Sequence, residues 1–359
     1  MRNRRVGDRP ARCSRSVLPA ALAGALLLTA ASARAQTAPP VSVGAGLQTS
    51  FAATSPDGGD TTASFLVNSA RLYVNGAPTD NIKFMFNTEY NGATNNIGVL
   101  DAAAQIAVSP KVNIWMGRFL PPSDRANLYG PYYSNQWGVY TDGVQDGYPF
   151  VAVGRDNGVL YWGQFGKVKL SGGLFDGPSL TGNTDVLVAA RAQVDLWDPE
   201  DGYYLNGTYY GGKNLLAIGG AIQAQDGNTA GNGDFLLEKK LGGGGTVSVE
   251  AEFAAYDKLG GYDSHYGNSK GGYVLGAYLF PKPTTGMGTF QLLGKFAKAN
   301  FSKGLSDADP DYDQKTTEIN VNYILKEFNA RLMFFYRNTT FSAVKTNSNT
   351  YGVGLQIQM

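Results

Sequence analysis

The sequence has few of the residues on which most binding and catalytic chemistry depends. Its 359 residues include one cysteine, Cys13, and one histidine, His265, and only 16% of the residues are charged. One cysteine cannot supply a disulfide framework or a cysteine-based zinc site, and the low charge is not that of a polybasic nucleic-acid-binding protein. These absences exclude disulfide scaffolds, zinc proteins and a nucleic-acid partner.

The first 35 residues are predicted to be a secretory signal peptide. Six arginines precede an apolar run, Val17 to Ala31, and Ala33-Arg34-Ala35 has the small-x-small pattern of a cleavage site. The alternative is a retained membrane anchor, but the run contains Pro19 and is shorter than the roughly 20 residues that cross a bilayer. We therefore expect a signal peptide over residues 1–35 and one mature domain over residues 36–359.

The mature chain differs in charge from the whole sequence. Residues 1–35 contain seven arginines and one aspartate, so 23 basic and 28 acidic residues remain, a formal net charge of −5. The mature chain has no cysteine and no run of 18 apolar residues, which excludes helical membrane spans. Two classes remain: a soluble periplasmic or secreted β protein, and an outer-membrane β-barrel.

Apolar and polar residues alternate along most of the mature chain, which predicts β-strands. In residues 246–255, the apolar Val247, Val249 and Phe253 alternate with polar Ser248 and Glu250. Many such runs reach the nine to eleven or so residues of a tilted membrane strand, whereas strands of soluble sandwiches are usually about five or six residues long. The pattern favours an all-β transmembrane antiparallel barrel.

The connections also alternate in length, as short periplasmic turns and longer extracellular loops do in outer-membrane barrels. The tight connections are Pro78 to Asn81, Ser109 to Lys111, Gly166-Lys167, Gly242 to Gly244 and Lys326 to Phe328. The longer ones are Ala52 to Ser64, Asn91 to Gly98, Leu120 to Pro149, Asp176 to Asp185, Asp226 to Gly233, Lys258 to Gly271, Ser302 to Gln314 and Ala343 to Asn347. This arrangement gives about sixteen strands, the last ending at Met359, provided that Trp197 to Asn214 is an extended periplasmic connection and not another strand.

The longest connection, Leu120 to Pro149, is rich in tyrosine and contains Trp137. A loop of this length in a compact fold is usually functional or disordered, and its aromatic residues argue against disorder. By count it is the third extracellular loop. We expect it to fold into the lumen and narrow the channel; the alternative is an external loop that packs on itself or on a neighbouring subunit.

Five sequence segments carry a resemblance to a known family. They are Asn68 to Gly76 (NSARLYVNG), Asn81 to Phe84 (NIKF), Asp101 to Ala103 (DAA), Gly117 to Leu128 (GRFLPPSDRANL) and Val153 to Val159 (VGRDNGV). The chain resembles the phosphate-selective porin O and P family. The resemblance implies a 16-stranded general or anion-preferring porin, trimeric, in the outer membrane of a Gram-negative bacterium, with outer-membrane lipid and lipopolysaccharide as its surroundings.

The charged residues expected at the constriction and along the lumen come from two places. From the long loop and its borders we predict Arg118, Asp124, Arg125 and Arg155, and from the polar strand faces Arg71, Lys83, Asp101 and Arg191. Phosphate-selective members of the family use an arginine ladder and a lysine cluster. Here no dense basic cluster is visible, acidic residues lie on equivalent strand faces, and the mature chain is net negative. A mixed-charge pore for small hydrophilic solutes or ions therefore fits better, and for any one arginine a lumenal salt bridge is the alternative role.

The remaining motifs do not indicate catalysis or a cofactor. His265 follows Asp263 and Ser264, but neighbours in sequence do not form a catalytic triad. The aspartates from Asp307 to Asp313 suggest a weak calcium site, yet the glycine of a calcium loop is missing. We predict a diffusion porin without enzymatic activity, metal or cofactor; the alternatives are a substrate-specific anion or small-solute channel, and a barrel enzyme or adhesin.

Overall fold

A computed structural model describes residues 41–144, 154–177, 186–260, 265–306, 309–343 and 346–359. The predicted signal peptide lies outside these ranges. In the described residues the chain forms sixteen strands, one short α-helix and one 3-10 helix. The elements are β1 (Val41–Pro56), β2 (Thr62–Gly76), β3 (Ile82–Asn91), β4 (Asn96–Ser109), β5 (Val112–Phe119), α1 (Arg125–Tyr129), η1 (Pro131–Tyr133), β6 (Asp156–Phe165), β7 (Val168–Phe175), β8 (Leu187–Asp195), β9 (Leu215–Gln225), β10 (Asn228–Lys240), β11 (Thr246–Asp257), β12 (Tyr266–Leu279), β13 (Thr289–Gly304), β14 (Tyr312–Lys326), β15 (Ala330–Phe341) and β16 (Ser348–Gln358). No helix in these ranges is both long enough and apolar enough to cross a membrane.

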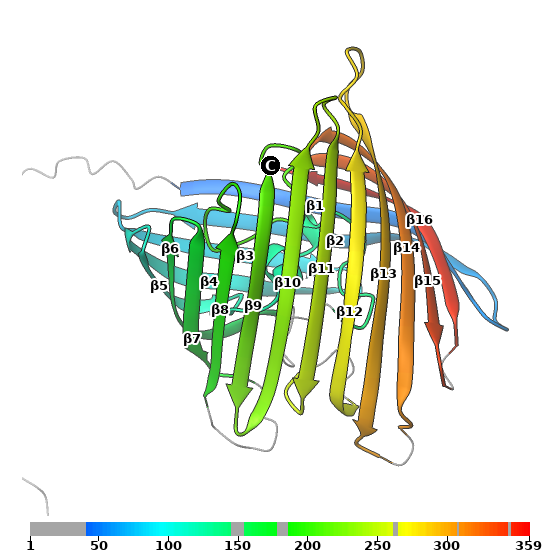
Figure 1. The fold of residues 1–359 in the computed structure, drawn as a ribbon, viewed down its shortest axis with the longest axis horizontal. Coiled ribbons are helices and arrows are strands. Elements are labelled where there is room, and N and C mark those ends of the chain that lie inside the picture. The colour runs from blue at the N-terminus through cyan, green and yellow to red at the C-terminus, as the bar shows by residue number, and fades with distance from the viewer. Residues whose placement is uncertain (1–40, 145–153, 178–185, 261–264, 307–308, 344–345) are drawn as a thin grey trace, which may run out of the picture. The chain divides into compact units, whose positions relative to one another are not determined.

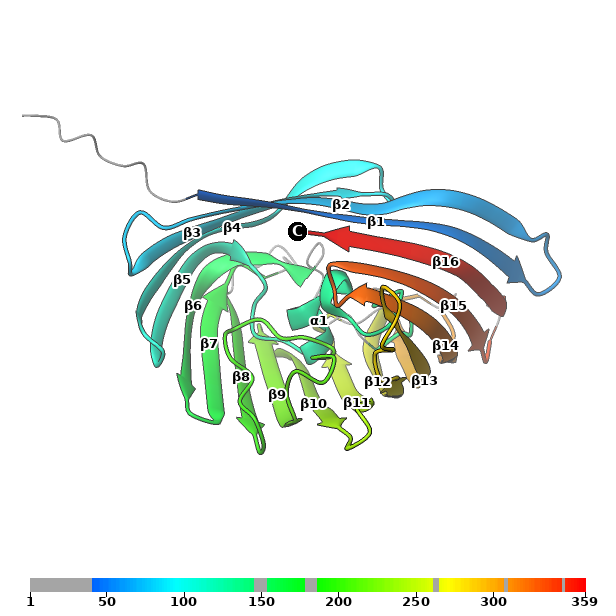
Figure 2. The same ribbon diagram turned by 90° about the horizontal axis from the view of Figure 1, so that it is seen from above.

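The strands form a closed barrel. Each strand pairs with the next in antiparallel fashion, and β16 pairs with β1 (Figures 1 and 2). The closing ladder runs from Gly46 opposite Gln358 to Pro56 opposite Ser348. Closure leaves no strand edge unpaired, which a sheet requires where no water is present to bind its backbone groups. The predicted all-β barrel of about sixteen strands is confirmed.

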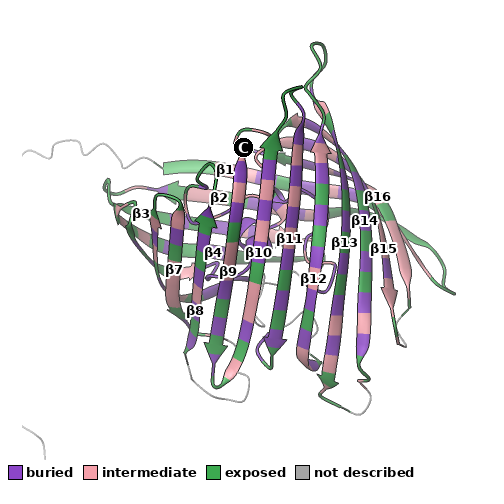
Figure 3. Cartoon of the chain, in the orientation of Figure 1, coloured by how far each residue is buried: buried purple, intermediate pink, exposed green. Residues whose placement is uncertain are grey.

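The two faces of the sheet are the reverse of those in a soluble protein. On β11 the polar Ser248, Glu250 and Glu252 are buried, whereas the side chain of Phe253 is 57% exposed. The same alternation of buried and exposed residues runs along the other strands (Figure 3). An apolar outer face and a polar inner face are the arrangement that lipid outside and polar contents inside require.

The connections differ from the predicted ones at several strand ends. Asp226 and Gly227 have φ angles of 50° and 73°, and they form the two-residue hairpin turn for which Asp-Gly is favoured. Strand β10 therefore begins at Asn228, and the predicted long loop from Asp226 to Gly233 is wrong. Other strands also continue into predicted loops, as β1 does to Pro56.

Candidate functional site

The connection between β5 and β6 is built around the short helix α1. The Asp124 Oδ1 atom accepts a hydrogen bond from the Asn127 backbone N–H at 2.6 Å, which satisfies a donor at the start of the helix. The helix ends at Gly130, whose φ of 62° suits a residue without a side chain. We call residues 120–144 the long loop; the rest of the predicted loop, up to Pro149, lies outside the described residues.

The long loop contacts inward-facing residues of strands that are far apart in the barrel. The hydroxyl of Tyr132 lies 3.1 Å from the hydroxyl of Ser69 on β2, and the hydroxyl of Tyr129 donates to Glu250 Oε1 on β11 at 2.8 Å. Figure 2 shows α1 within the ring of strands. These hydrogen bonds hold the loop against opposite parts of the wall.

The junction of β1 and β16 is also held by this loop. The backbone carbonyls of residues 131–134 accept hydrogen bonds at 2.6 to 3.2 Å from Gln48 on β1, Arg331 on β15 and Gln356 on β16. All three donors face inward and are buried. One turn of the loop thus connects the two ends of the sheet.

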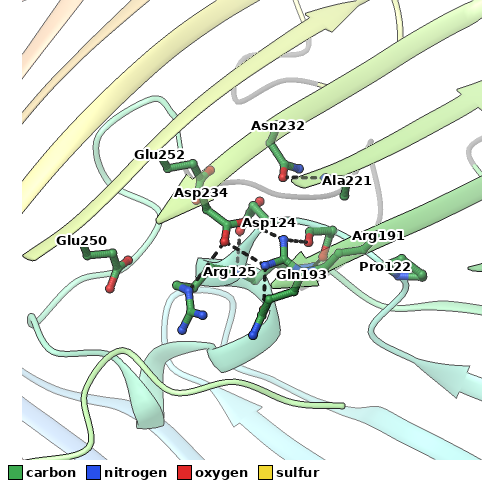
Figure 4. A network of polar contacts seen from close by, with 12 residues as sticks. Pro122, Asp124, Arg125, Arg191, Gln193, Ala221, Asn232, Asp234, Glu250 and Glu252 are labelled. Carbon is green, nitrogen blue, oxygen red and sulfur yellow. Dashed lines mark hydrogen bonds and ion pairs between the residues drawn. The ribbon is translucent and has the colours of Figure 1, made fainter. Parts of the chain in front are cut away.

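A buried network of charged side chains fixes α1 (Figure 4). Arg125 donates two hydrogen bonds to Glu200, at 2.6 and 2.9 Å, and Arg191 donates two to Asp234, at 2.5 and 2.8 Å. The Arg125 Nε atom also lies 3.6 Å from Asp234, which joins the two pairs. Paired hydrogen bonds of this kind fix geometry as well as charge, so these arginines hold the loop in place.

Two carboxyl groups next to this network differ in their pKa. Burial, together with the nearby Asp234 carboxylate, outweighs the hydrogen bond from Asn127 and raises the pKa of Asp124 to about 7. Burial acts in the same direction on Glu200, but the Arg125 guanidinium outweighs it and lowers the pKa of Glu200 to about 2. Asp124 therefore changes its charge near neutral pH, whereas Glu200 stays ionised.

The far end of the long loop is attached to the opposite wall. Asp142 forms an ion pair with Lys295 on β13 at 2.5 Å, and both side chains are buried. The Lys295 ammonium also lies 4.3 Å from the centre of the Tyr273 ring, a distance at which the ring face attracts a cation. The loop is thus held by ionic contacts at both ends.

The connection between β8 and β9 forms the second inward segment. Residues 197–214 contain no strand, as predicted, and several of them pack against the long loop. The Gly207 backbone N–H donates to the Tyr133 carbonyl at 2.8 Å, and the Tyr203 hydroxyl donates to the Leu120 carbonyl at 2.8 Å. Tyr203 also packs beside Trp115, with ring centres 5.0 Å apart.

A cavity of about 230 Å³ remains between the long loop and the wall formed by the first strands. Its charged lining residues are Arg71, Glu89 and Arg155. Arg71 pairs with Glu89 at 2.8 Å, and Arg155 lies 3.3 Å from Asp101. The walls of the cavity therefore carry both signs of charge.

The structure brings most of the predicted charged residues into two groups. The first group surrounds α1 and contains Asp124, Arg125 and Arg191; the second surrounds the cavity and contains Arg71, Asp101 and Arg155. In both groups each arginine has an acidic partner. These four arginine–carboxylate contacts are salt bridges, which is the alternative role expected from the sequence for any one arginine.

Two predicted residues lie elsewhere. Arg118 is directly opposite Ala102 on β4, which is exposed, and it donates a hydrogen bond to the Val99 carbonyl at 3.3 Å. Because opposite residues lie on the same face of a sheet, Arg118 points away from the lumen. The reason is local, because the alternation on β5 places Trp115 inward and Arg118 outward. Lys83 is on the inward register but is exposed at the start of β3, and it joins neither group.

Two acidic residues of the α1 network were absent from the predicted set. Glu200 lies in the connection 197–214, and Asp234 directly follows the predicted loop from Asp226 to Gly233, most of which belongs to β10. The available signal was the Asp-Gly pair at 226–227, which favours a hairpin turn and places Asp234 within a strand. Nothing in the sequence spacing connects Glu200 with Arg125.

The motifs set aside in the sequence have ordinary partners or lie outside the described residues. Asp263, Ser264 and Asp307 are outside the described ranges. Asp309 accepts a hydrogen bond from the Ser306 hydroxyl at 2.6 Å, and Asp313 pairs with Lys298 at 2.9 Å. Among the residues that the structure describes, no group of three or more histidine, cysteine, aspartate or glutamate side chains is placed to hold a metal ion.

Comparisons with known proteins identify the fold. No family model matches the sequence, and no curated protein matches it either. Solved structures do match: OmpF of Salmonella typhi has a TM-score of 0.60 at 11% identity, covering 89% of this chain and 98% of that one. An anion-selective porin from Comamonas acidovorans has a TM-score of 0.55 at 14% identity, covering 89% and 99%.

A trimer form of OmpT, an outer membrane protein of Vibrio cholerae, has a TM-score of 0.54 at 13% identity, covering 89% of this chain and 99% of that one. At such identities the likeness establishes the fold. The chain has the 16-stranded barrel fold of outer-membrane porins, and this fold fits a location in the outer membrane of a Gram-negative bacterium.

Proposed function

We propose that the protein is an outer-membrane diffusion porin that passes small hydrophilic solutes and ions. The observation that carries this proposal is the mixed-charge cavity of about 230 Å³ between the long loop and the wall. A polar wall that carries both signs of charge lowers the cost of moving hydrated ions through a low-dielectric barrier. The long loop, anchored at α1 and at Asp142, sets the width of the passage and acts as its constriction.

The direct test is conductance in planar bilayers, with reversal potentials measured in a salt gradient. We expect stable channels of small conductance, because the long loop and the connection 197–214 occupy much of the interior. A barrel that incorporates into the bilayer without any ion current contradicts the proposal. An enzyme or adhesin with this fold would give that result.

Arg155 is expected to favour anions in the passage. It lines the cavity, and one unit charge about 6 Å away in water lowers the energy of a passing anion and raises that of a passing cation by about 0.7 kcal/mol each, or roughly tenfold in their relative permeability. Arg155→Gln should therefore lower the anion-to-cation permeability ratio by up to about tenfold, measured as a shift in reversal potential. The control is Lys83→Gln, which removes a charge outside both groups and should leave the ratio nearly unchanged. Equal shifts of the reversal potential in Arg155→Gln and Lys83→Gln would show that ions do not pass beside Arg155.

Selectivity is also expected to depend on pH through Asp124. Its pKa of about 7 means that the carboxyl group is neutral at pH 5 and charged at pH 9. Anion preference should fall as the pH rises across this range, with a midpoint near pH 7, and Asp124→Asn should flatten this change while keeping the helix cap. If anion preference in Asp124→Asn still changes with a midpoint near pH 7, a group other than Asp124 is responsible for the pH dependence.

A substrate-specific anion channel is the second candidate. It is supported by the arginines of the cavity and by the resemblance of residues 117–128 to the phosphate-selective porins. Inhibition of the chloride current by low concentrations of phosphate would favour it, and an unchanged current would favour general diffusion.

The assembly that we propose is a homotrimer in outer-membrane lipid. The support is the fold shared with a Vibrio cholerae protein that was solved in a trimer form. In the proposed membrane orientation, the short turns face the periplasm. The end of the barrel that carries the long loop faces the cell exterior, where lipopolysaccharide forms the surrounding leaflet.

A further inference from the structure

Three lysines lie on the outward face of neighbouring strands. They are Lys270 on β12, Lys298 on β13 and Lys315 on β14, and these three strands lie side by side in Figure 1. Lys298 is in the same outward register as Phe296, whose side chain is 50% exposed. Lys298 is directly opposite Lys315, and on its other side it is opposite Gly272, two residues from Lys270. The three ammonium groups thus belong to one patch, which we call the lysine patch.

The depth of this patch corresponds to the edge of the lipid bilayer. Tyr278 and Phe280 pack at the other end of the same outer face, with ring centres 4.8 Å apart. From Lys270 to Phe280, about ten residues at about 3.3 Å each and tilted by about 45° span about 23 Å, close to the roughly 25 Å height of an apolar barrel band. The lysine patch lies at the edge nearer the long loop, where headgroups of the outer leaflet are located.

The lysine patch is incompletely neutralised by the protein. Like charges directly opposite each other on neighbouring strands are destabilising. Asp313 pairs with Lys298 at 2.9 Å and also attracts Lys315, so one carboxylate is shared by two lysines. Lys270 forms no ion pair within the described ranges. An anion beside the three lysines would relieve the remaining repulsion.

Two adjoining hollows on the outer face suggest the shape of that anion. A polar cavity of about 250 Å³ is lined by Lys270, together with Asn300, Ser302 and the carboxylate-bearing Asp257. An apolar groove of about 660 Å³ is lined by β8 to β11 and shares Thr229 and Ala255 with the polar cavity. A polar cavity thus adjoins an apolar groove on the outward face of the sheet.

The groove exists because small residues lie between large ones. Gly231 is opposite Ile222 on one side and Ala255 on the other, and Ile222 is 70% exposed. Phe253 forms the other side of the groove. A Cβ atom added at Gly231 would meet only the Ala221 carbonyl oxygen, at 3.7 Å, so a larger residue can enter the groove here without a clash at its Cβ atom.

We propose that this surface binds one phosphate-bearing lipid of the outer leaflet, lipopolysaccharide, with a phosphate at the lysine patch and an acyl chain in the groove. The inference rests on the proposed outer-membrane location, and it goes beyond the proposed transport function because the surface lies outside the lumen. The lysines supply charge-assisted hydrogen bonds to phosphate oxygens. The groove supplies apolar contacts that a free phosphate ion does not use.

The experiment measures retention of lipid A, the phosphorylated anchor of lipopolysaccharide, by the purified barrel in detergent, using native mass spectrometry. Bisphosphorylated and dephosphorylated lipid A are compared, with inorganic phosphate as a separate competitor. We expect Lys298→Gln with Lys315→Gln to weaken binding of the phosphorylated lipid about 10- to 30-fold and to leave the dephosphorylated lipid unchanged. Gly231→Ile should weaken both lipids.

The matched control is Lys239→Gln, an outward lysine at the opposite end of β10, where its ammonium lies 4.9 Å from the Trp197 ring centre. It should bind both lipids as the wild type does. Equal retention by all variants would overturn the proposal, and so would displacement of the lipid by millimolar phosphate alone. Because the substituted residues face outward, channel conductance should stay unchanged in every variant, which separates this test from that of the transport function.

Discussion

Replacing Ala251 with arginine is expected to destabilise the barrel by about 2 to 4 kcal/mol, the cost of an arginine near the middle of a lipid-facing strand. Ala251 lies halfway along β11, opposite Phe235 and Val274 on the same outward face. The guanidinium group would have to lie in the apolar band, because the neighbouring outward residues are apolar. The free energy of unfolding in lipid vesicles, measured by urea titration, gives the result.

Ala255→Arg is the matched control for this prediction. Ala255 is on the same strand and the same face but lies close to the end of β11, where Asp257 is already exposed. At that depth an arginine should cost about 0 to 1 kcal/mol, to which the repulsion from Lys270, directly opposite on β12, adds roughly 0.2 to 1 kcal/mol. Equal costs at the two positions would show that the outer face does not contact a bilayer in the way that the barrel requires.

Replacing Arg125 with leucine is expected to have the largest effect in the interior. The side chains of Arg125 and Glu200 are both fully buried, so removing the guanidinium leaves a carboxylate without its main partner. Breaking a buried ion pair in this way costs about 3 to 5 kcal/mol. We expect a lower thermal transition on gels and a larger, noisier single-channel current, because the long loop loses its attachment to the connection 197–214.

A second substitution distinguishes an ionic role from a steric one. Arg125→Leu combined with Glu200→Leu removes both charges and should recover part of the lost stability. Arg118→Leu removes an arginine from the outward face and should have little effect on the current. If Arg118→Leu and Arg125→Leu behave alike, the buried network does not fix the long loop.

The fold could be predicted because lipid imposes a simple pattern on the sequence. Alternation along β11 identifies the two faces without any knowledge of its neighbours, since the outer face is apolar whatever strand lies beside it. The strand ends were harder to predict. Beyond the edge of the lipid both faces of a strand can be polar, so the alternation of apolar and polar residues is lost there. The last residues of β1, up to Pro56, therefore have the composition of a loop although they belong to the strand.

The contents of the barrel could be predicted only in part. The length and aromatic residues of the long loop indicate an inward segment, but its partners depend on pairings across the lumen. Arg125 and Glu200 are 75 positions apart in the sequence, and no local pattern connects them. The connection 197–214 was identified as a connection, yet its packing against the long loop depends on contacts such as that between Gly207 and Tyr133, which only the closed barrel brings together.

The hydrogen bonds from Gln48, Arg331 and Gln356 to residues 131–134 have a consequence for the order of assembly. These donors come from both sides of the β1–β16 junction, so all three bonds form only when the two ends of the chain have met. Pairing of strands this distant in sequence is slow, because a long loop of chain must be closed first. The long loop gives both ends a common surface on which to meet, so its seating and the last step of barrel closure become a single cooperative event.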